Sequence, residues 1–193
     1  MTRPANDCFA LPPGVDWTPV DEALQRLREG VRPVTQIEEL PVGEAAGRVL
    51  ALEAVARRSN PPADNSAIDG YAFAHAALPE PDADGLVTMP LAPGRAAAGH
   101  PAPGRLARGH ALRILTGAPI PEDADTVVMQ EDAEEVAGGI RFAPPRKPGA
   151  NRRLAGEDAA LGETVLEAGR RLSPQDLARA VAAGLGTLSV HRP

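Results

Sequence analysis

The two clearest helix signatures of this sequence lie near its two ends, and the stretch between them carries none. The first covers residues 18–30, which open with Thr-Pro-Val-Asp and close on a glycine. Thr18 is the expected N-cap, proline suits the first helical position, and Gly30 is a typical stop. Apolar residues recur there at helical spacing and share one face: Val20, Ala23, Leu24 and Leu27.

The second signature follows the same pattern near the C-terminus. Ser173 is the expected N-cap, a proline follows it, and Asp176 stands where a capping box places an acid. Leu172 and Leu177 occupy hydrophobic-staple positions, and Gly184 ends the run. The sequence therefore predicts a helix near each end of the chain.

The stretch between these helices is divided by turn residues. The chain contains 21 prolines and 19 glycines among 193 residues, a high share that predicts many short elements. Residues 90–109 are rich in Gly, Pro and Ala and predict loops around at most a short strand. Residues 135–142 predict a hairpin that turns near Gly138 and Gly139. Short strands are predicted at four further places: 112–115, 126–130, 163–166 and 188–190.

This order of elements favours an α+β fold. We expect a mixed helix and strand domain formed by both chain ends, residues 15–60 plus 148–193, with a β-rich inserted domain at residues 61–147. Apolar residues make up 43% of the chain but aromatic residues only 3%, so the core should consist mainly of Val, Leu, Ile and Ala.

Composition and charge argue against several classes of protein. No apolar run approaches the roughly 18 residues of a membrane span, and residues 1–20 lack the pattern of a secretion signal. We therefore expect a cytoplasmic protein without a membrane partner. The formal net charge is −6 and no Lys/Arg block is present, which argues against nucleic acid as a partner.

Familiar metal and catalytic motifs are also missing. Cys8 is the only cysteine, which excludes an internal disulfide and a CxxC metal site and favours an incidental thiol. The four histidines are scattered without metal-ligand spacing. The sequence contains no GxSxG, GxxxxGK[ST] or GxGxxG pattern, so it predicts neither a serine hydrolase nor a glycine-loop nucleotide site.

The densest polar segment is residues 60–72, Asn-Pro-Pro-Ala-Asp-Asn-Ser-Ala-Ile-Asp-Gly-Tyr-Ala. Its short polar side chains suit a well-capped turn that enters a strand, which is the simpler interpretation. The alternative is a rigid loop that presents Asp69 together with the polar side chains of Asn65 and Ser66. Such a loop can hold a hard cation or orient an oxygen-rich substrate.

A second polar cluster spans residues 113–132, Arg-Ile-Leu-Thr-Gly-Ala-Pro-Ile-Pro-Glu-Asp-Ala-Asp-Thr-Val-Val-Met-Gln-Glu-Asp. A strand that ends in Thr-Gly would place the Thr116 hydroxyl and the Gly117 amide at an exposed tip, where an anion can bind. The simpler interpretation is a hairpin connection in which Thr116 bonds a local carbonyl.

The third cluster is residues 151–158, Asn-Arg-Arg-Leu-Ala-Gly-Glu-Asp, with Arg146 and Lys147 just upstream. Its cations, Arg153 among them, can clamp a phosphate or another oxyanion, while Glu157 or Asp158 takes a metal or proton role. The alternative is a solvated loop with surface ion pairs, each worth roughly 0–1 kcal/mol.

Together and in this order, the three clusters resemble the molybdopterin molybdenumtransferase family, which includes bacterial MoeA and the E domain of gephyrin. The resemblance runs from the helix at residue 18 to the terminal Val-His-Arg-Pro and corresponds to the N-terminal two-domain portion of the family. It implies insertion of molybdenum from molybdate into adenylyl-molybdopterin, with Mg²⁺ assisting and AMP released. It also implies a homodimer with an intersubunit active site, and a contact with the molybdopterin adenylyltransferase is a further expectation.

The resemblance also implies roles for individual residues. Asp69 matches a required carboxylate, and Thr116 and Asp158 match two further residues of the cleft. Asp69 and Asp158 are the expected catalytic residues, and Asp69 is the candidate ligand for Mg²⁺, directly or through water. The residues expected to bind substrate are Asn65, Ser66, Thr116, Gly117, Arg153 and Glu157.

Two departures from the family pattern bear on these expectations. Arg152 follows Asn151 where the family commonly has an aliphatic residue, and the later Thr-Gly-Asp-Glu, Ser-Gly-Gly and Pro-Gly-Asn-Pro motifs are absent. We therefore expect this chain by itself to bind adenylyl-molybdopterin weakly and not to turn over. The alternative is a stand-alone scaffold or dimerisation module of the same fold without catalysis.

Overall fold

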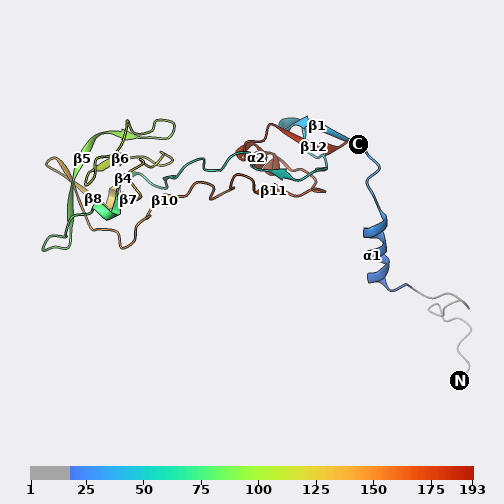
Figure 1. Ribbon diagram of the computed structural model, residues 1–193, viewed down its shortest axis with the longest axis horizontal. Helices are drawn as coiled ribbons and strands as arrows, with labels where there is room; N and C mark the ends of the chain where they lie inside the picture. Colours follow the sequence, from blue (N-terminus) through green and yellow to red (C-terminus); the bar gives the residue numbers. More distant parts are fainter. Residues whose placement is uncertain (1–17) are drawn as a thin grey trace, which may run out of the picture. The chain divides into compact units, whose positions relative to one another are not determined.

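The computed structural model describes residues 18–193 (Figure 1). The chain divides into two compact units, with the boundary in the sequence between Gln36 and Ile37. Cys8 and residues 15–17 of the expected mixed domain lie outside the described residues. Among residues 18–193, no helix has the length and apolar content needed to cross a bilayer.

The first unit contains helix α1, Val20–Gly30, as the sequence predicts, but its cap differs. The N-cap position is Pro19, and no side chain caps the helix. The expectation that Thr18 caps it is therefore wrong, because the helix begins one residue later than the Thr-Pro pattern suggests and proline has no side-chain acceptor. No α1 residue is buried, and Val20 and Leu27 on its apolar face are 73% and 59% exposed.

In the second unit, strands and a helix from near both of its ends pack around one hydrophobic core, and we call this part the small frame. Strand β1, Ile37–Pro41, pairs antiparallel with β12, Thr187–His191, so that Ile37 lies opposite His191. Strand β2, Ala54–Val55, pairs with β11, Thr164–Leu166, and the short 3-10 helix η1 covers Val42–Glu44. Helix α2, Pro174–Ala182, closes this frame over an aliphatic core (Figure 1).

The predicted capping box of α2 is present. The Ser173 hydroxyl accepts from the Asp176 amide, while the Asp176 carboxylate accepts from the Ser173 amide at 2.9 Å. Arg170 adds an ion pair to Asp176 at 2.9 Å. These donors hold the pKa of the Asp176 carboxyl near 2, below its ordinary value of 3.8, with the Arg170 hydrogen bond as the largest cause.

We expect Asp176→Ala to lower the free energy of unfolding by about 1–2 kcal/mol at neutral pH, because it removes the cap and the ion pair. A carboxyl whose pKa is lower in the folded state stabilises the fold at pH values above its unfolded-state pKa. This stabilisation is lost as the pH falls and the carboxyl protonates in the folded state. The difference from the parent chain should therefore shrink as pH falls from about 4 towards 2. Denaturant unfolding across this range tests it, with the exposed Glu167→Ala as control; equal loss in both variants would contradict the assignment.

A six-stranded sheet in the order β7-β4-β6-β5-β9-β8 occupies the middle of the chain and forms an open half-barrel. Its strands are β4 (Gly70–Phe73), β5 (Val87–Ala96), β6 (Ala111–Ile114), β7 (Thr126–Met129), β8 (Ala133–Val136) and β9 (Gly139–Phe142). The 3-10 helices η2, His75–Ala77, and η3, Gln130–Asp132, follow β4 and β7. Two clusters of buried apolar side chains, mainly aliphatic, pack within this sheet region.

Most of the predicted strands are present, and the β8–β9 hairpin has the predicted glycine in its turn, Gly138, at φ 77°. The loop expected at residues 90–109 is wrong in its first part, because β5 continues through Pro90 and Pro93 to Ala96. Residues 87–90 pair with β9, and the strand then changes partner to run parallel to β6 through an irregular register. A strand that changes partner at a bulge tolerates prolines that would interrupt a regular ladder.

A third pair of strands lies between the frame and the half-barrel. Strand β3, Asn65–Ser66, runs antiparallel to β10, Arg152–Arg153. We propose the domain division at residues 15–60 plus 148–193 and 61–147. The separate hydrophobic cores on either side of this strand pair support it for residues 37–193. The overall class is α+β, mostly strand with two helices and with paired terminal strands, as expected from the sequence.

Candidate functional site

The three polar clusters of the sequence meet around strand β3. On one side, the Gly117 amide donates to the Ser66 carbonyl at 2.8 Å, and the Ser66 amide donates to the Ala118 carbonyl at 2.9 Å. On the other side, β10 pairs Arg153 with Asn65. Three segments that are separate in the sequence therefore converge in the backbone, with the first cluster between the other two.

Asp69 and Thr116 are joined by two hydrogen bonds in this region. The carboxylate Oδ1 of Asp69 accepts from both the amide and the hydroxyl of Thr116, each at 2.7 Å. The Asp69 carbonyl also accepts from the Gln130 amide at 3.1 Å. Asp69 precedes β4 and Thr116 follows β6, so two paired strands end with their polar side chains bonded to each other.

These contacts stabilise the charged form of Asp69. The hydrogen bonds from the Thr116 amide and hydroxyl lower the pKa of the Asp69 carboxyl below its ordinary value, and the nearby Arg113 charge lowers it further. Both Thr116 donors end on Oδ1, which leaves Oδ2 outside this pair of bonds. Asp69 therefore offers an ionised carboxylate oxygen in a fixed orientation.

Asp158 belongs to a second group of contacts. Its carboxylate pairs with Arg153 and accepts from the Asn60 side chain at 3.2 Å. Glu157 accepts from the Leu154 amide at 3.1 Å and lies 3.6 Å from Arg153. The loop after β10 thus holds two carboxylates around one guanidinium, and its hydrogen-bond partners differ from those of Asp69.

The remaining predicted residues hold the loops together. The buried Ser66 hydroxyl donates to the Ile68 carbonyl at 2.6 Å, and the Gly117 amide is already bonded to Ser66. Asn65 Oδ1 and Arg152 Nε are buried atoms without a hydrogen-bond partner among the described residues. Substrate-binding roles for Asn65, Ser66 and Gly117 therefore stay predictions.

Sequence reasoning missed Arg113, Gln130 and Asp64. Arg113 bonds the Gly70 carbonyl at 3.1 Å and the Gln130 side chain, next to the Asp69–Thr116 pair. Asp64 accepts from the Ala155 amide at 2.8 Å and pairs with Arg152 at 3.1 Å. The one available signal was an arginine within the otherwise apolar strand Ala-Leu-Arg-Ile.

Asp69, the candidate Mg²⁺ ligand, does not belong to a larger metal-ligating cluster of the described residues. No group of three or more His, Cys, Asp or Glu side chains in residues 18–193 gathers around a common metal position. Mg²⁺ in phosphate chemistry is often held by one or two carboxylates while phosphates and water fill its other positions. Asp69 Oδ2 meets that requirement as a single hard oxygen ligand.

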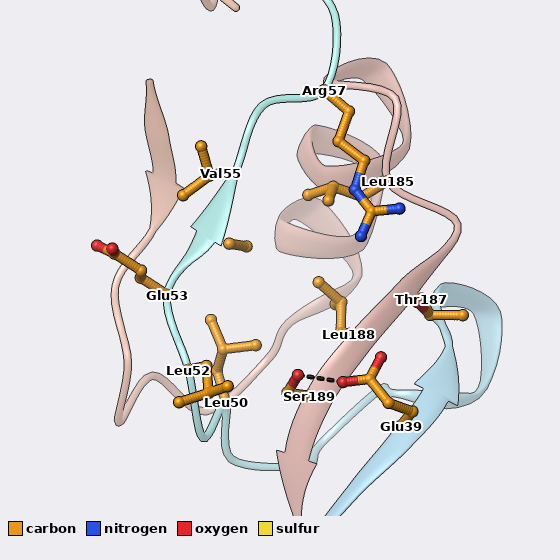
Figure 2. Close-up of a pocket in the computed structure, with 11 residues that line it drawn as sticks. Glu39, Leu50, Leu52, Glu53, Val55, Arg57, Leu185, Thr187, Leu188 and Ser189 are labelled. Atoms are coloured by element: carbon orange, nitrogen blue, oxygen red, sulfur yellow. Dashed lines mark hydrogen bonds between the residues drawn. The ribbon is translucent and has the colours of Figure 1, made fainter. Parts of the chain in front are cut away.

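One hollow lies in the small frame and another along the half-barrel, and only the second includes residues of the polar clusters. A hollow of about 200 Å³ in the small frame is lined by residues of β1, β2 and β12. Figure 2 shows the Ser189 hydroxyl, which donates to Glu39 at this hollow. A larger hollow, about 660 Å³, includes Met129 and Glu131 of the second cluster and Asn151 of the third. Asp69, Thr116 and Asp158 line neither of the two hollows; Thr116 and Asp158 are exposed, and Asp69 is half-buried.

Comparison with known proteins identifies the class defined by this fold and these three clusters. The family described as MoeA N-terminal region (domain I and II) matches residues 18–184. The chain therefore belongs to the MoeA N-terminal region family.

Individual relatives agree with this assignment. A molybdopterin molybdenumtransferase of Haemophilus influenzae is 36% identical over 174 residues, which are 90% of this chain and 42% of the relative. Molybdopterin molybdenumtransferase 2 of Mycobacterium tuberculosis is 36% identical over 167 residues, or 86% of this chain and 40% of the relative. The crystal structure of a molybdopterin biosynthesis MoeA protein from Pyrococcus horikoshii has a TM-score of 0.77 at 34% identity, covering 91% of this chain and 46% of that one. The chain thus spans less than half the length of these relatives.

Proposed function

We propose that this chain forms one wall of the active site of a molybdopterin molybdenumtransferase, which inserts molybdenum from molybdate into adenylyl-molybdopterin and releases AMP. The observation that carries the proposal is the Asp69–Thr116 pair, a fixed and ionised carboxylate at the end of two adjacent strands. Named relatives with 36% identity over most of the chain support the substrate class.

In this proposal, Thr116 fixes the Asp69 carboxylate through two hydrogen bonds to Oδ1. The second carboxylate oxygen, Oδ2, would then face the ligand. A Mg²⁺ ion bound with the substrate would neutralise phosphate charge. Asp69 would orient such an ion or a water molecule at the phosphoanhydride, and Arg153 would supply positive charge to an anionic group. Asp158 and Glu157 keep the Arg153 guanidinium in place.

The proposal includes an assembly and a location. Asp69 is half-buried and Thr116 is exposed, so in this proposal a second surface completes the cleft around them. A homodimer would supply that surface. We also propose a cytoplasmic location and a contact with the molybdopterin adenylyltransferase, whose product would be the substrate here.

The test joins this chain to the part of the Haemophilus influenzae relative beyond the matched region and measures AMP release with molybdate and Mg²⁺. We expect Asp69→Asn to reduce turnover by about 100-fold or more, since removal of a catalytic carboxylate typically costs that much. Asp82→Asn is the matched control, because Asp82 is also a loop carboxylate that accepts a backbone amide hydrogen bond but lies outside the three clusters.

Two results would contradict the proposal. Normal turnover of the joined protein with Asp69→Asn would remove the assigned role of that carboxylate. Efficient molybdenum insertion by the 193-residue chain alone would show that its surface needs no completing wall.

A further inference from the structure

The Arg113 side chain connects strands β6 and β4 with η3, next to the Asp69–Thr116 pair. Arg113 lies on β6 opposite Tyr71 of β4, and its guanidinium stacks over the Tyr71 ring at 5.1 Å from the centroid. Its Nη1 donates to the Gly70 carbonyl at 3.1 Å, and its Nη2 donates to the Gln130 side chain just beyond β7. One side chain thus reaches from β6 across β4 to η3.

Both hydrogen-bond partners of Arg113 also border Asp69. Gly70 follows Asp69 directly in the chain, and the Gln130 amide donates to the Asp69 carbonyl at 3.1 Å. Arg113 therefore holds the carbonyl of the residue that follows Asp69 and the side chain of the residue that bonds the Asp69 carbonyl. Thr116, which bonds the Asp69 carboxylate, lies three residues after Arg113 beyond the end of the same strand.

The Tyr71 ring extends this network to the opposite edge of the sheet. The Tyr71 hydroxyl donates to Glu135 of β8 at 2.7 Å, although β4 and β8 are not neighbours in the sheet. The Tyr71 side chain on which Arg113 stacks is thus held by strand β4 at one end and by the hydrogen bond of its hydroxyl group at the other. A planar guanidinium can stack and donate through two nitrogens at the same time, which an ammonium group cannot do.

We propose that Arg113 is a positioning residue that holds Asp69 in register with Thr116. The significance for catalysis rests on the proposed function, in which the Asp69 carboxylate faces the substrate. The positioning itself is a property of this chain and needs no substrate to be measured.

The test follows the Thr116 amide proton by NMR in the 193-residue chain. A proton donated to a carboxylate at 2.7 Å reports on that bond, and Asp69→Asn defines its position when the charge is absent. We expect Arg113→Met to move this resonance at least halfway towards its position in Asp69→Asn. Arg113→Lys, which keeps the charge but not the forked donor, should move it in the same direction by less.

The matched control is Arg95→Met. Arg95 is an exposed arginine paired in register with Arg113 on the neighbouring strand β5, so its replacement makes the same chemical change one strand away. The Thr116 resonance should stay at its parent position in Arg95→Met. A merely structural role of Arg113 would lower the melting temperature without moving this resonance.

The outcomes separate the two proposals. An unchanged Thr116 resonance in folded Arg113→Met overturns the positioning role; if that variant does not fold, an unchanged resonance in Arg113→Lys overturns it. If the resonance moves as expected while the joined protein with Asp69→Asn turns over normally, the positioning holds and the proposed function fails. If Asp69→Asn abolishes turnover while the Thr116 resonance is unchanged in folded Arg113→Met, the proposed function holds and the positioning role of Arg113 fails.

Discussion

Gly70→Ala is expected to destabilise the half-barrel by more than about 3 kcal/mol, among the largest effects that a single methyl group can have. A Cβ at Gly70 would overlap the backbone carbonyl oxygen of Val128 and lie 3.1 Å from the Val127 side chain. The obstacle is backbone, which cannot rotate away as a side chain can. Strands β4 and β7 would have to separate, and the Gly70 carbonyl bonded to Arg113 would shift with them.

Chemical denaturation followed by circular dichroism measures this effect. Gly186→Ala is the control, because a Cβ there meets nothing within 4 Å and its φ lies outside the left-handed region. It should be neutral or stabilise by up to about 1 kcal/mol through the unfolded state. Equal stability of the two variants would mean that β4 and β7 lie farther apart than described.

Phe73→Ala should cost about 3–5 kcal/mol, which places it in the same range. Phe73 is fully buried, and its ring meets that of Phe142 at a centroid distance of 5.1 Å and an angle of 39°. The chain has few aromatic side chains, so this pair fills a volume that the surrounding aliphatic residues cannot occupy. The expected result is a cavity between the two faces of the half-barrel.

Thermal and denaturant unfolding measure this loss, and the 67% exposed Leu161 supplies the comparison. Leu161→Ala should change the free energy of unfolding by no more than about 0.5 kcal/mol. A similarly small effect for Phe73→Ala would show that the aromatic pair does not close the core of the sheet.

Local sequence signals predicted those parts of the fold that local interactions determine. The capping box of α2 lies within four consecutive residues, and the β8–β9 hairpin depends on one turn with a glycine in the left-handed region. Strand β5 was missed because its stability comes from partners far along the chain. Its pairing with β9 and then β6 outweighs the local preference of Pro90 and Pro93 for turns.

For the candidate site, the sequence indicated individual residues but not the contacts between them. Asp69, Thr116 and the loop of Asp158 were found as motif residues, and the structure brings their segments together. No sequence pattern states that Asp69 and Thr116 bond each other, or that Asp158 has different partners. Arg113 was missed because its role depends on the order of β6, β4 and β7 in the sheet, which a linear pattern does not contain.

The pairing of β3 with β10 has an evolutionary consequence. The polypeptide leaves for the half-barrel along one of these strands and returns along the other, so both crossings occur at a single place. Whatever lies between them is anchored at one point and can lengthen, shorten or be exchanged without a break in the strands on the other side. Changes of loop length within the half-barrel are therefore expected to leave the strand pairs of the small frame intact.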